Sequence, residues 1–264
     1  MNIGLEISIV IISWEMRDFL KKCLRSIYNF TSDVSFEIIV IDNNSSDGTS
    51  DMVRNEFPEV TLIKNRRNIG VAPARNQGIS MTKGKYILIL DADMELIENS
   101  IFSLYEFMET NAECGISGCK LVDNKLNLQY SCKRFPNFLS FIFRRLEQFK
   151  IVRNSKTLSY HTMRDWNHEE IREVDYLIGA CQFIRKYVVE KIGMYDGKIF
   201  YGPEDLDFCL RSWKAGWKVI YYPHTSIIHH EQRITKKKIF SIISLKHFRG
   251  ILYIYKKYKW KIKI

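Results

Sequence analysis

The sequence has little proline or glycine and no long apolar run. Its 264 residues include only 5 Pro and 13 Gly, which excludes collagen-like and low-complexity chains. No uninterrupted run of about 18 apolar residues occurs, so we expect no transmembrane helix. The apolar run at residues 7–12 is short and follows Glu6, which argues against a secretory signal. Because 46% of the residues are hydrophobic, the chain can fill the core of one large domain.

The spacing of the cysteines is not that of a disulfide or metal-binding framework. There are six of them, and no CxxC pair occurs. Without a secretory signal, this pattern favours free thiols in a reducing cytoplasm and excludes a disulfide scaffold. We therefore expect a cytoplasmic protein.

Acidic residues are absent from the C-terminal segment 232–264, which holds 11 Lys and Arg. The first 231 residues carry 29 basic and 30 acidic side chains, so the excess positive charge belongs to the tail. This predicts a domain over 1–231 and a basic, amphipathic helical tail over 232–264, and it argues against nucleic-acid binding by the domain. The tail either contacts an anionic membrane surface or packs on its own domain, because a largely apolar helix needs a covering surface.

Short apolar runs alternate with segments of helical period in the first half of the chain. This alternation is typical of an α/β fold with a mostly parallel central sheet flanked by helices. We expect strands at residues 7–13, 36–42, 60–64, 86–91, 115–121 and 217–222. We expect helices near residues 17–29, 49–57, 73–82 and 97–110. Residues 137–167 are rich in aromatic and basic side chains without a clear period, and we interpret them as a lid or acceptor-side loop.

Polar residues follow the predicted strands, and the carboxyl ends of parallel strands share the edge where α/β proteins bind ligands. Asp42 ends one strand and is placed to bind a base or ribose, with turn chemistry as the alternative, whereas residues 47–49 fit turn and helix-cap chemistry. Gly70 and Pro73 begin a helix whose amino end suits an anion. Arg75 in that helix is either a diphosphate ligand or a salt-bridged surface arginine.

Two carboxylates stand two residues apart after the strand at 86–91. Asp91 and Asp93 point to the same side of an extended backbone, where their repulsion calls for a cation such as Mn²⁺ or Mg²⁺. A helix-cap role for Asp93 is the alternative. Of the histidines that follow the strand at 217–222, His229 could complete the metal shell.

Three acids surround the predicted start of a helix after Gly202-Pro203. Helix-dipole interactions and an i,i+4 pair between Asp207 and Arg211 explain one or two of these acids. A third acid that faces a cleft would be a general-base candidate.

These motifs together resemble glycosyltransferase family 2, the inverting enzymes with the GT-A nucleotide-sugar-binding fold. They occur in the order and at the spacing of that family over residues 7–230. The second half is similar to the bacterial rhamnosyltransferase-like subgroup of surface-glycan enzymes, through Tyr222-Pro223 and Ile228-His229. The motifs that carry the family resemblance are residues 8–14, Asp42 to Thr49, Asn68 to Gly78, Asp91-Ala92-Asp93, Gly179-Ala180-Cys181 and Gly202 to Arg211.

The resemblance implies a role for each matching residue. Asp42 would hold the nucleobase, Asp91 the ribose or a metal-bound water, and Asp93 the metal on the diphosphate, with His229 completing its shell. Asp205 matches the general base. Arg211 would brace Asp207, and Glu204 and Asp207 would be acceptor or support residues. The full nucleotide-sugar-binding set is Ser13, Asp42, Asn44, Arg75 and Asp91.

The implied reaction is transfer of a hexosyl or deoxyhexosyl group from a UDP- or dTDP-linked donor to a glycan or lipid-linked acceptor, in bacterial surface polysaccharide synthesis such as that of O-antigen. Peripheral association with the inner face of the cell membrane would suit such an acceptor. Two other classes share some features: a non-catalytic polyanion- or membrane-binding protein, and a sugar nucleotidyltransferase. The first leaves the domain motifs unexplained. Sugar nucleotidyltransferases are expected to have a Gly-rich loop and a lysine directly after the first strand. This chain instead has Ser13-Trp14-Glu15-Met16-Arg17 at that place.

Overall fold

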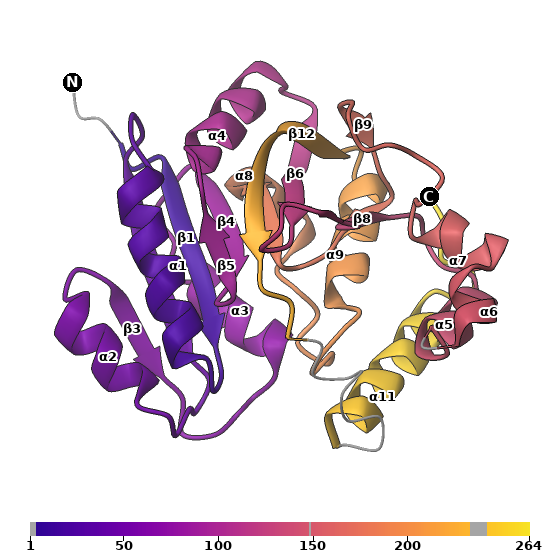
Figure 1. Cartoon of the computed structure of the whole chain (residues 1–264), viewed down its shortest axis with the longest axis horizontal. Coiled ribbons are helices and arrows are strands. Elements are labelled where there is room, and N and C mark those ends of the chain that lie inside the picture. The colour runs from indigo at the N-terminus through magenta and orange to yellow at the C-terminus, as the bar shows by residue number, and fades with distance from the viewer. Residues whose placement is uncertain (1–3, 148, 233–241) are drawn as a thin grey trace.

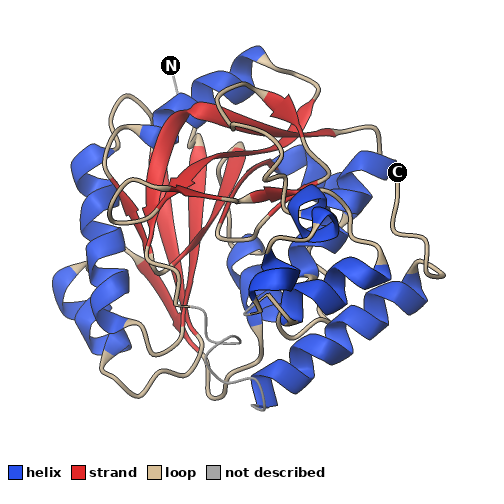
Figure 2. Ribbon diagram, turned by 45° about the vertical axis from the view of Figure 1, so that its right-hand side comes forward, coloured by secondary structure: helices blue, strands red, loops and turns tan. Residues whose placement is uncertain are grey.

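The computed structural model of the chain describes residues 4–147, 149–232 and 242–264. A large sheet forms its centre, and helices cover both faces (Figures 1 and 2). The strands of this sheet are β1 (Ile7–Ser13), β2 (Phe36–Asp42), β3 (Thr61–Lys64), β4 (Tyr86–Asp91), β5 (Met94–Leu96), β6 (Cys114–Val122), β7 (Leu128–Gln129), β9 (Arg172–Glu173), β11 (Cys181–Arg185) and β12 (Lys218–His229). β8 (Cys132–Lys133) and β10 (Tyr176–Leu177) pair separately.

The helices lie close to the predicted segments in the first half of the chain. They are α1 (Arg17–Phe30), α2 (Thr49–Glu56), α3 (Val71–Ile79), α4 (Ser100–Thr110), α5 (Phe138–Arg145), α6 (Lys150–Arg153), α7 (Lys156–His161), α8 (Lys186–Ile192), α9 (Glu204–Lys214) and α11 (Ile242–Lys257). Within the described residues, no helix is long and apolar enough to cross a membrane.

The sheet runs β3-β2-β1-β4-β11-β6-β12-β5, and its first four strands are parallel, as predicted. The second half is mixed, because β11 lies antiparallel between β4 and β6 while β12 is parallel to β6. The register pairs Ser13 with Asp42 and Ile12 with Asp91. The polar residues that follow β1, β2 and β4 therefore begin at the same edge of the sheet.

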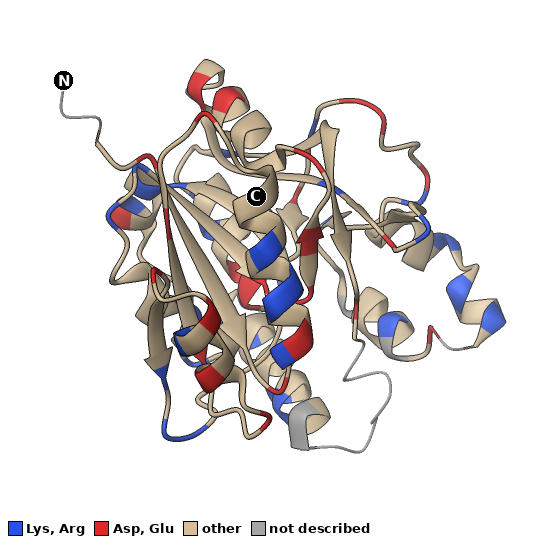
Figure 3. Ribbon diagram, turned by 60° about the vertical axis from the view of Figure 1, so that its left-hand side comes forward, with Lys and Arg blue, Asp and Glu red and all other residues tan. Residues whose placement is uncertain are grey.

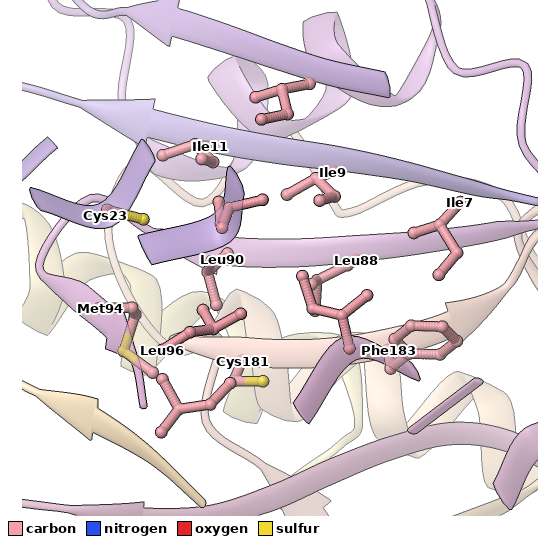
Figure 4. Packing of buried hydrophobic residues seen from close by; sticks show 14 of the residues in the cluster. Ile7, Ile9, Ile11, Cys23, Leu88, Leu90, Met94, Leu96, Cys181 and Phe183 are labelled. Atoms are coloured by element: carbon pink, nitrogen blue, oxygen red, sulfur yellow. The ribbon is translucent and has the colours of Figure 1, made fainter. Parts of the chain in front are cut away.

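Alternating side chains of the central strands fill two cores. In β1, Ile9 and Ile11 belong to the cluster on one face of the sheet and Val10 to the cluster on the other. Figure 4 shows the first cluster, where Leu88 and Leu90 of β4 lie between β1 and β11. All six cysteines are free and buried, which confirms the expectation of free thiols.

The segment 137–167 is not a loop, and that interpretation was wrong. It contains α5, α6 and α7, whose short lengths leave too few turns for a helical period to be visible in the sequence. Side-chain caps start two of these helices: Asn137 accepts from the backbone N–H of Ser140, and Ser155 accepts from that of Leu158. The charged residues within α5 and α6 are all basic, at positions 144, 145, 150 and 153 (Figure 3).

The C-terminal helix α11 packs on the rest of the chain. Ile251, Ile254 and Tyr255 are buried in the same core as α9, and the Tyr255 ring meets Phe141 of α5 edge-on. For residues 242–264 the structure thus shows the packed alternative for the tail, while residues 233–241 lie outside the described part. The proposed division of the chain at residue 231 stays a prediction.

Candidate functional site

A pocket of about 720 Å³ opens where the strand-end motifs meet. It is formed by the residues after β1 and β4, the loop before α3, the loop before α9, and residues of β8, α5 and α11. Six of the predicted site residues line it: Arg75, Asp91, Asp93, Glu204, Asp205 and His229. The structure therefore brings together residues that are up to 154 positions apart in the sequence, from Arg75 to His229.

Arg75 links the two acidic groups of this pocket. Its Nη2 donates to Asp91 Oδ1 at 3.0 Å, and its Nη1 donates to Glu204 Oε1 at 2.8 Å. Nη2 also donates to the carbonyl of Gly179 at 2.7 Å. The side chain is 2% exposed, so Arg75 is a buried brace rather than the surface arginine considered above. Both Nη groups already bind protein oxygens, which fixes the guanidinium as a brace, and its direct ligand role stays a prediction.

Gly179 is required by this arrangement. A Cβ atom at position 179 would lie within 2.8 Å of three guanidinium atoms of Arg75. The guanidinium cannot move away without losing its bonds to Asp91 and Glu204. This steric requirement explains why the Gly179-Ala180-Cys181 motif begins with glycine.

Asp93 and His229 form the other acidic part of the pocket. Asp93 is buried, and burial together with the charge of Asp91 raises the pKa of its carboxyl group. His229 Nε2 lies 3.7 Å from Asp93 Oδ1. Gln129 Nε2 donates to the His229 carbonyl, which turns its Oε1 toward His229 Nδ1 at 2.9 Å. Nδ1 therefore carries a proton in this pair, and the Nε2 lone pair of a neutral ring is free to face Asp93.

Asp93 and His229 fit a divalent cation whose remaining ligands are phosphate oxygens of a bound nucleotide. Within the described ranges, no group of three His, Cys, Asp or Glu side chains is arranged as a complete metal site. Asp91 is bound by Arg75 through Oδ1, whereas Asp93 Oδ1 and His229 Nε2 face each other at 3.7 Å. A carboxylate, an imidazole and phosphate oxygens form a donor set suited to Mn²⁺ or Mg²⁺.

Glu204 and Asp205 lie side by side at the start of α9 but differ in surroundings. Burial raises the pKa of Glu204 to about 7, and Arg75 is its partner. Asp205 is half-buried, and its oxygens accept from the backbone N–H groups of Gly179 at 3.1 Å and Leu206 at 2.8 Å. Burial also raises the pKa of Asp205. Asp205 is thus the more accessible carboxylate of the two.

Asp207 does not line the pocket. It is a fully buried residue of α9 itself, and its Oδ2 accepts from Arg211 Nε at 2.9 Å, as the i,i+4 spacing predicts. Its Oδ1 accepts from Lys257 Nζ and from Tyr258 Oη, both at 2.7 Å. Asp207 therefore joins the C-terminal helix to the helix that carries Glu204 and Asp205, which supports the bracing role given to Arg211.

Ser13, Asp42 and Asn44 are near this edge of the sheet but do not line the pocket. Asp42 is fully buried and accepts from the Ser45 backbone N–H at 2.8 Å and from Ser50 Oγ. Asn44 is an exposed turn residue with φ of 72°. In this structure Asp42 and Asn44 help to form the turn after β2, and the role of all three residues in nucleotide binding stays a prediction.

Sequence reasoning missed several pocket residues. Asn43 lines the pocket, and its side chain binds Asn68 and the Gly70 carbonyl, which ties the end of β2 to the loop before α3. Its place in the Asp-Asn-Asn motif was the available signal. Lys133 and Arg144 also line the pocket, but they come from the segments without a readable period, so no pattern pointed to them.

The chain belongs to glycosyl transferase family 2, since the family model matches residues 8–193. It is 23% identical over 250 residues to the N-acetylglucosaminyl-diphospho-decaprenol L-rhamnosyltransferase of Mycobacterium tuberculosis, covering 90% of this chain and 80% of that protein. Its fold is similar to that of GalNAc-T7, solved with UDP, GalNAc and Mn²⁺, with a TM-score of 0.63, 18% identity and coverage of 87% of this chain and 44% of that one.

A mannosyltransferase from Pyrobaculum calidifontis, solved with GDP-Man and Mn²⁺, gives a TM-score of 0.60 at 17% identity, over 88% of this chain and 59% of that one. This chain thus spans about half the length of the solved chains that it matches. The family match confirms the resemblance seen in the sequence motifs, and the structural likeness confirms the GT-A fold.

Proposed function

We propose that the chain is an inverting, metal-dependent glycosyltransferase that moves a sugar from a nucleoside-diphosphate donor to an acceptor hydroxyl. The observation that carries this proposal is the shared pocket, which Asp91, Asp93, His229 and Asp205 all line. Within it, Arg75 connects Asp91 to Glu204, the neighbour of Asp205 in α9. Transfer needs a place for the leaving diphosphate and a base for the acceptor, and this pocket has residues for both.

The donor half of the reaction falls to the Asp93 end of the pocket. Asp93 and His229 would hold Mn²⁺ or Mg²⁺, which offsets the charge of the leaving diphosphate. Asp91, fixed by Arg75, has one oxygen left for a ribose hydroxyl or a metal-bound water. Asp42, Ser13 and Asn44 remain the proposed contacts of the nucleotide, which we take to be UDP or dTDP. The relatives solved with UDP or GDP-Man and Mn²⁺ support this class of ligand.

The acceptor half falls to Asp205. Its half-buried carboxylate lines the pocket and is placed to take the proton of the acceptor hydroxyl while that oxygen attacks the anomeric carbon opposite the departing diphosphate. The N–H groups of Gly179 and Leu206 fix its orientation, and its raised pKa makes it a better proton acceptor than a free aspartate. Glu204, neutralised by Arg75, is the support residue.

We assign the acceptor to the lipid-linked class of bacterial surface polysaccharide synthesis. The mycobacterial relative carries a polyprenyl-linked acceptor in its name. The surface beside the pocket supports this assignment, because α5 and α6 expose apolar side chains next to basic ones. Ile151 is 88% and Phe149 55% exposed, and Phe248 of the neighbouring α11 is 44% exposed. Such a surface suits peripheral association with the anionic inner face of the cell membrane of a cytoplasmic protein.

A hydrolysis screen of nucleotide sugars tests this proposal without knowledge of the acceptor. Purified full-length protein is incubated with UDP-, dTDP- and GDP-sugars, with Mn²⁺, with Mg²⁺ and with EDTA, and release of nucleoside diphosphate is measured. We expect slow, metal-dependent hydrolysis of one donor class. Release of pyrophosphate from a nucleoside triphosphate and a sugar phosphate would instead identify a nucleotidyltransferase, and inactivity with every donor would favour a binding protein.

A further inference from the structure

The pocket has a second charged end that the donor chemistry does not use. Lys133 of β8, Arg144 of α5 and Arg153 of α6 line it, together with the apolar side chains of Phe141, Ile178 and Ile251. The charges that act on Lys133 are those of Arg144, Asp205 and Glu147, whereas those that act on Asp93 are Asp91 and His229. The three basic residues come from β8, α5 and α6, whereas Asp93 follows β4 and His229 ends β12, so different elements supply the two groups. Of the two acids at the start of α9, Asp205 is the one whose charge acts on Lys133.

Lys133 is placed where a cation is costly. It is 6% exposed, and its ammonium donates one hydrogen bond, to the Tyr130 carbonyl at 2.8 Å. Burial and the positive charge of Arg144 lower the pKa of Lys133 to about 7. Within the described part of the chain, neither Lys133 nor Arg144 forms an ion pair. A buried cation without a counter-charge opposes folding, so a ligand with negative charge would stabilise this end of the pocket.

The remaining charged groups nearby do not neutralise this end. Glu147 also lines the pocket, but its Oε1 is paired with Arg164 at 2.5 Å. His161 is kept neutral, since burial and the charges of Arg144 and Lys133 lower its pKa to about 3. The cluster of Lys133, Arg144 and Arg153, which we call the basic end, thus carries a net positive charge beside an apolar wall.

We propose that the basic end binds the phosphate or diphosphate group of the acceptor, while Asp205 receives the acceptor hydroxyl. This inference rests on the proposed function and specifies its substrate: a sugar joined through phosphate to an apolar chain. The sugar would lie between Asp205 and the basic end, and the chain would leave along Phe141 and Ile251 toward the exposed apolar residues of α5 and α6. Charge-assisted bonds from lysine and arginine to phosphate oxygens supply the affinity.

The same chemistry could come from the donor diphosphate, and the metal separates the two sources. A donor held at Asp93 and His229 needs Mn²⁺, whereas an anion at the basic end does not. The probe is octyl diphosphate, and its binding is measured by calorimetry in EDTA with the full-length protein. The variants are Arg144→Gln, Lys133→Met and Asp93→Asn. Lys156→Gln is the matched control, because Lys156 is exposed on α7, lies outside the pocket and removes the same charge.

We expect wild-type protein, Lys156→Gln and Asp93→Asn to bind octyl diphosphate in EDTA. Arg144→Gln and Lys133→Met should each bind at least tenfold more weakly. Lys133→Met replaces a buried ammonium by an apolar side chain, so it should be no less stable than wild type, and a melting curve checks that it is folded. Octyl glucoside, which lacks the diphosphate, should bind far more weakly than octyl diphosphate.

Two results would overturn the inference. One is equal binding of octyl diphosphate to wild type and to Arg144→Gln. The other is binding that requires Mn²⁺ and disappears in Asp93→Asn, which would place the anion at the donor end. Failure of the proposed function is a different result, namely absence of hydrolysis in the donor screen while octyl diphosphate still binds in EDTA.

Discussion

Asp205 and Asp207 stand two residues apart, and the structure predicts opposite effects when each is replaced by Asn. Asp207→Asn should mainly lower stability, and Asp205→Asn should mainly lower turnover. Asp207 is fully buried and accepts from Arg211, Lys257 and Tyr258, so Asp207→Asn removes the negative charge from a site that keeps two cations. Complete loss of a buried charge partner costs about 3–5 kcal/mol. Here Arg211 retains the carbonyls of Ile192 and Met194, and Lys257 retains Asp196, so we expect a smaller loss of about 2–3 kcal/mol.

Such a loss would lower the melting temperature of a chain of this size by about 4–12 °C. Asp205→Asn should behave differently. Its carboxylate has a pKa raised by burial, so removing the charge relieves an unfavourable burial, which offsets the loss of one acceptor for the Gly179 or Leu206 N–H. We expect its stability to stay within about 1 kcal/mol of wild type, and its turnover to fall by roughly 10²–10⁴.

The assay measures melting curves and transfer or donor-hydrolysis rates per folded molecule for wild type and the two variants. Asp196→Asn is a control, because Asp196 also binds Lys257 but has no contact with α9 Asp207. Asp196→Asn should weaken the attachment of α11 without removing the Asp207 charge from α9. An inactive but fully stable Asp207→Asn, together with an active Asp205→Asn, would show that the base and the brace have been exchanged in our account.

Three further predictions follow from the pocket. Gly179→Ala should reduce turnover by at least tenfold and lower stability by about 1–3 kcal/mol, because its Cβ would displace the Arg75 guanidinium; wild-type activity would refute the brace. The kcat/KM of wild type should fall toward acid pH. The Glu204–Asp205 pair must be deprotonated before it can accept the acceptor proton, and burial raises the pKa of both groups, that of Glu204 to about 7. A rate constant unchanged from pH 8 to pH 4 in folded protein would contradict this. Replacing exposed Arg249 and Lys256 of α11 by Gln should weaken binding to anionic vesicles about tenfold or more, whereas the same change at exposed Lys22 and Lys125 should not; equal sedimentation of both variants, or no wild-type binding at low salt, would remove the membrane proposal.

The parallel half of the sheet could be predicted because its strands are buried on both faces and read as continuous apolar runs. β1, β2 and β4 begin and end at the predicted residues. The antiparallel strand β11 was not predicted, because residues 181–185 contain Gln182 and Arg185 and are too short to show a period. The helices of 138–161 escaped for the same reason, since each has at most about two turns.

Much of the candidate site could also be predicted, because carboxylates after parallel strands meet at one edge. The sequence could not reveal which of these groups neutralise one another. Arg75 meets Glu204 across 129 positions, and Lys257 meets Asp207 across 50, and such pairings depend on the packing of α3 and α11 against α9. Likewise Asp42 is a strand-end carboxylate like Asp91, yet Ser45 of the following turn and Ser50 of α2 bind its two oxygens.

The central claim of this account is that Asp93 and His229 hold a divalent metal that binds the donor diphosphate. Calorimetric titration of UDP and dTDP into wild type and Asp93→Ala, with Mn²⁺ and with EDTA, tests it most directly. We predict that wild type binds one of the two nucleotides with Mn²⁺ and loses most of that affinity in EDTA, while Asp93→Ala remains folded and binds weakly in both conditions, because a pocket-wall carboxylate contributes little to the core. Equal affinity of wild type with and without Mn²⁺, or unchanged Mn²⁺-dependent binding by Asp93→Ala, would contradict the metal assignment.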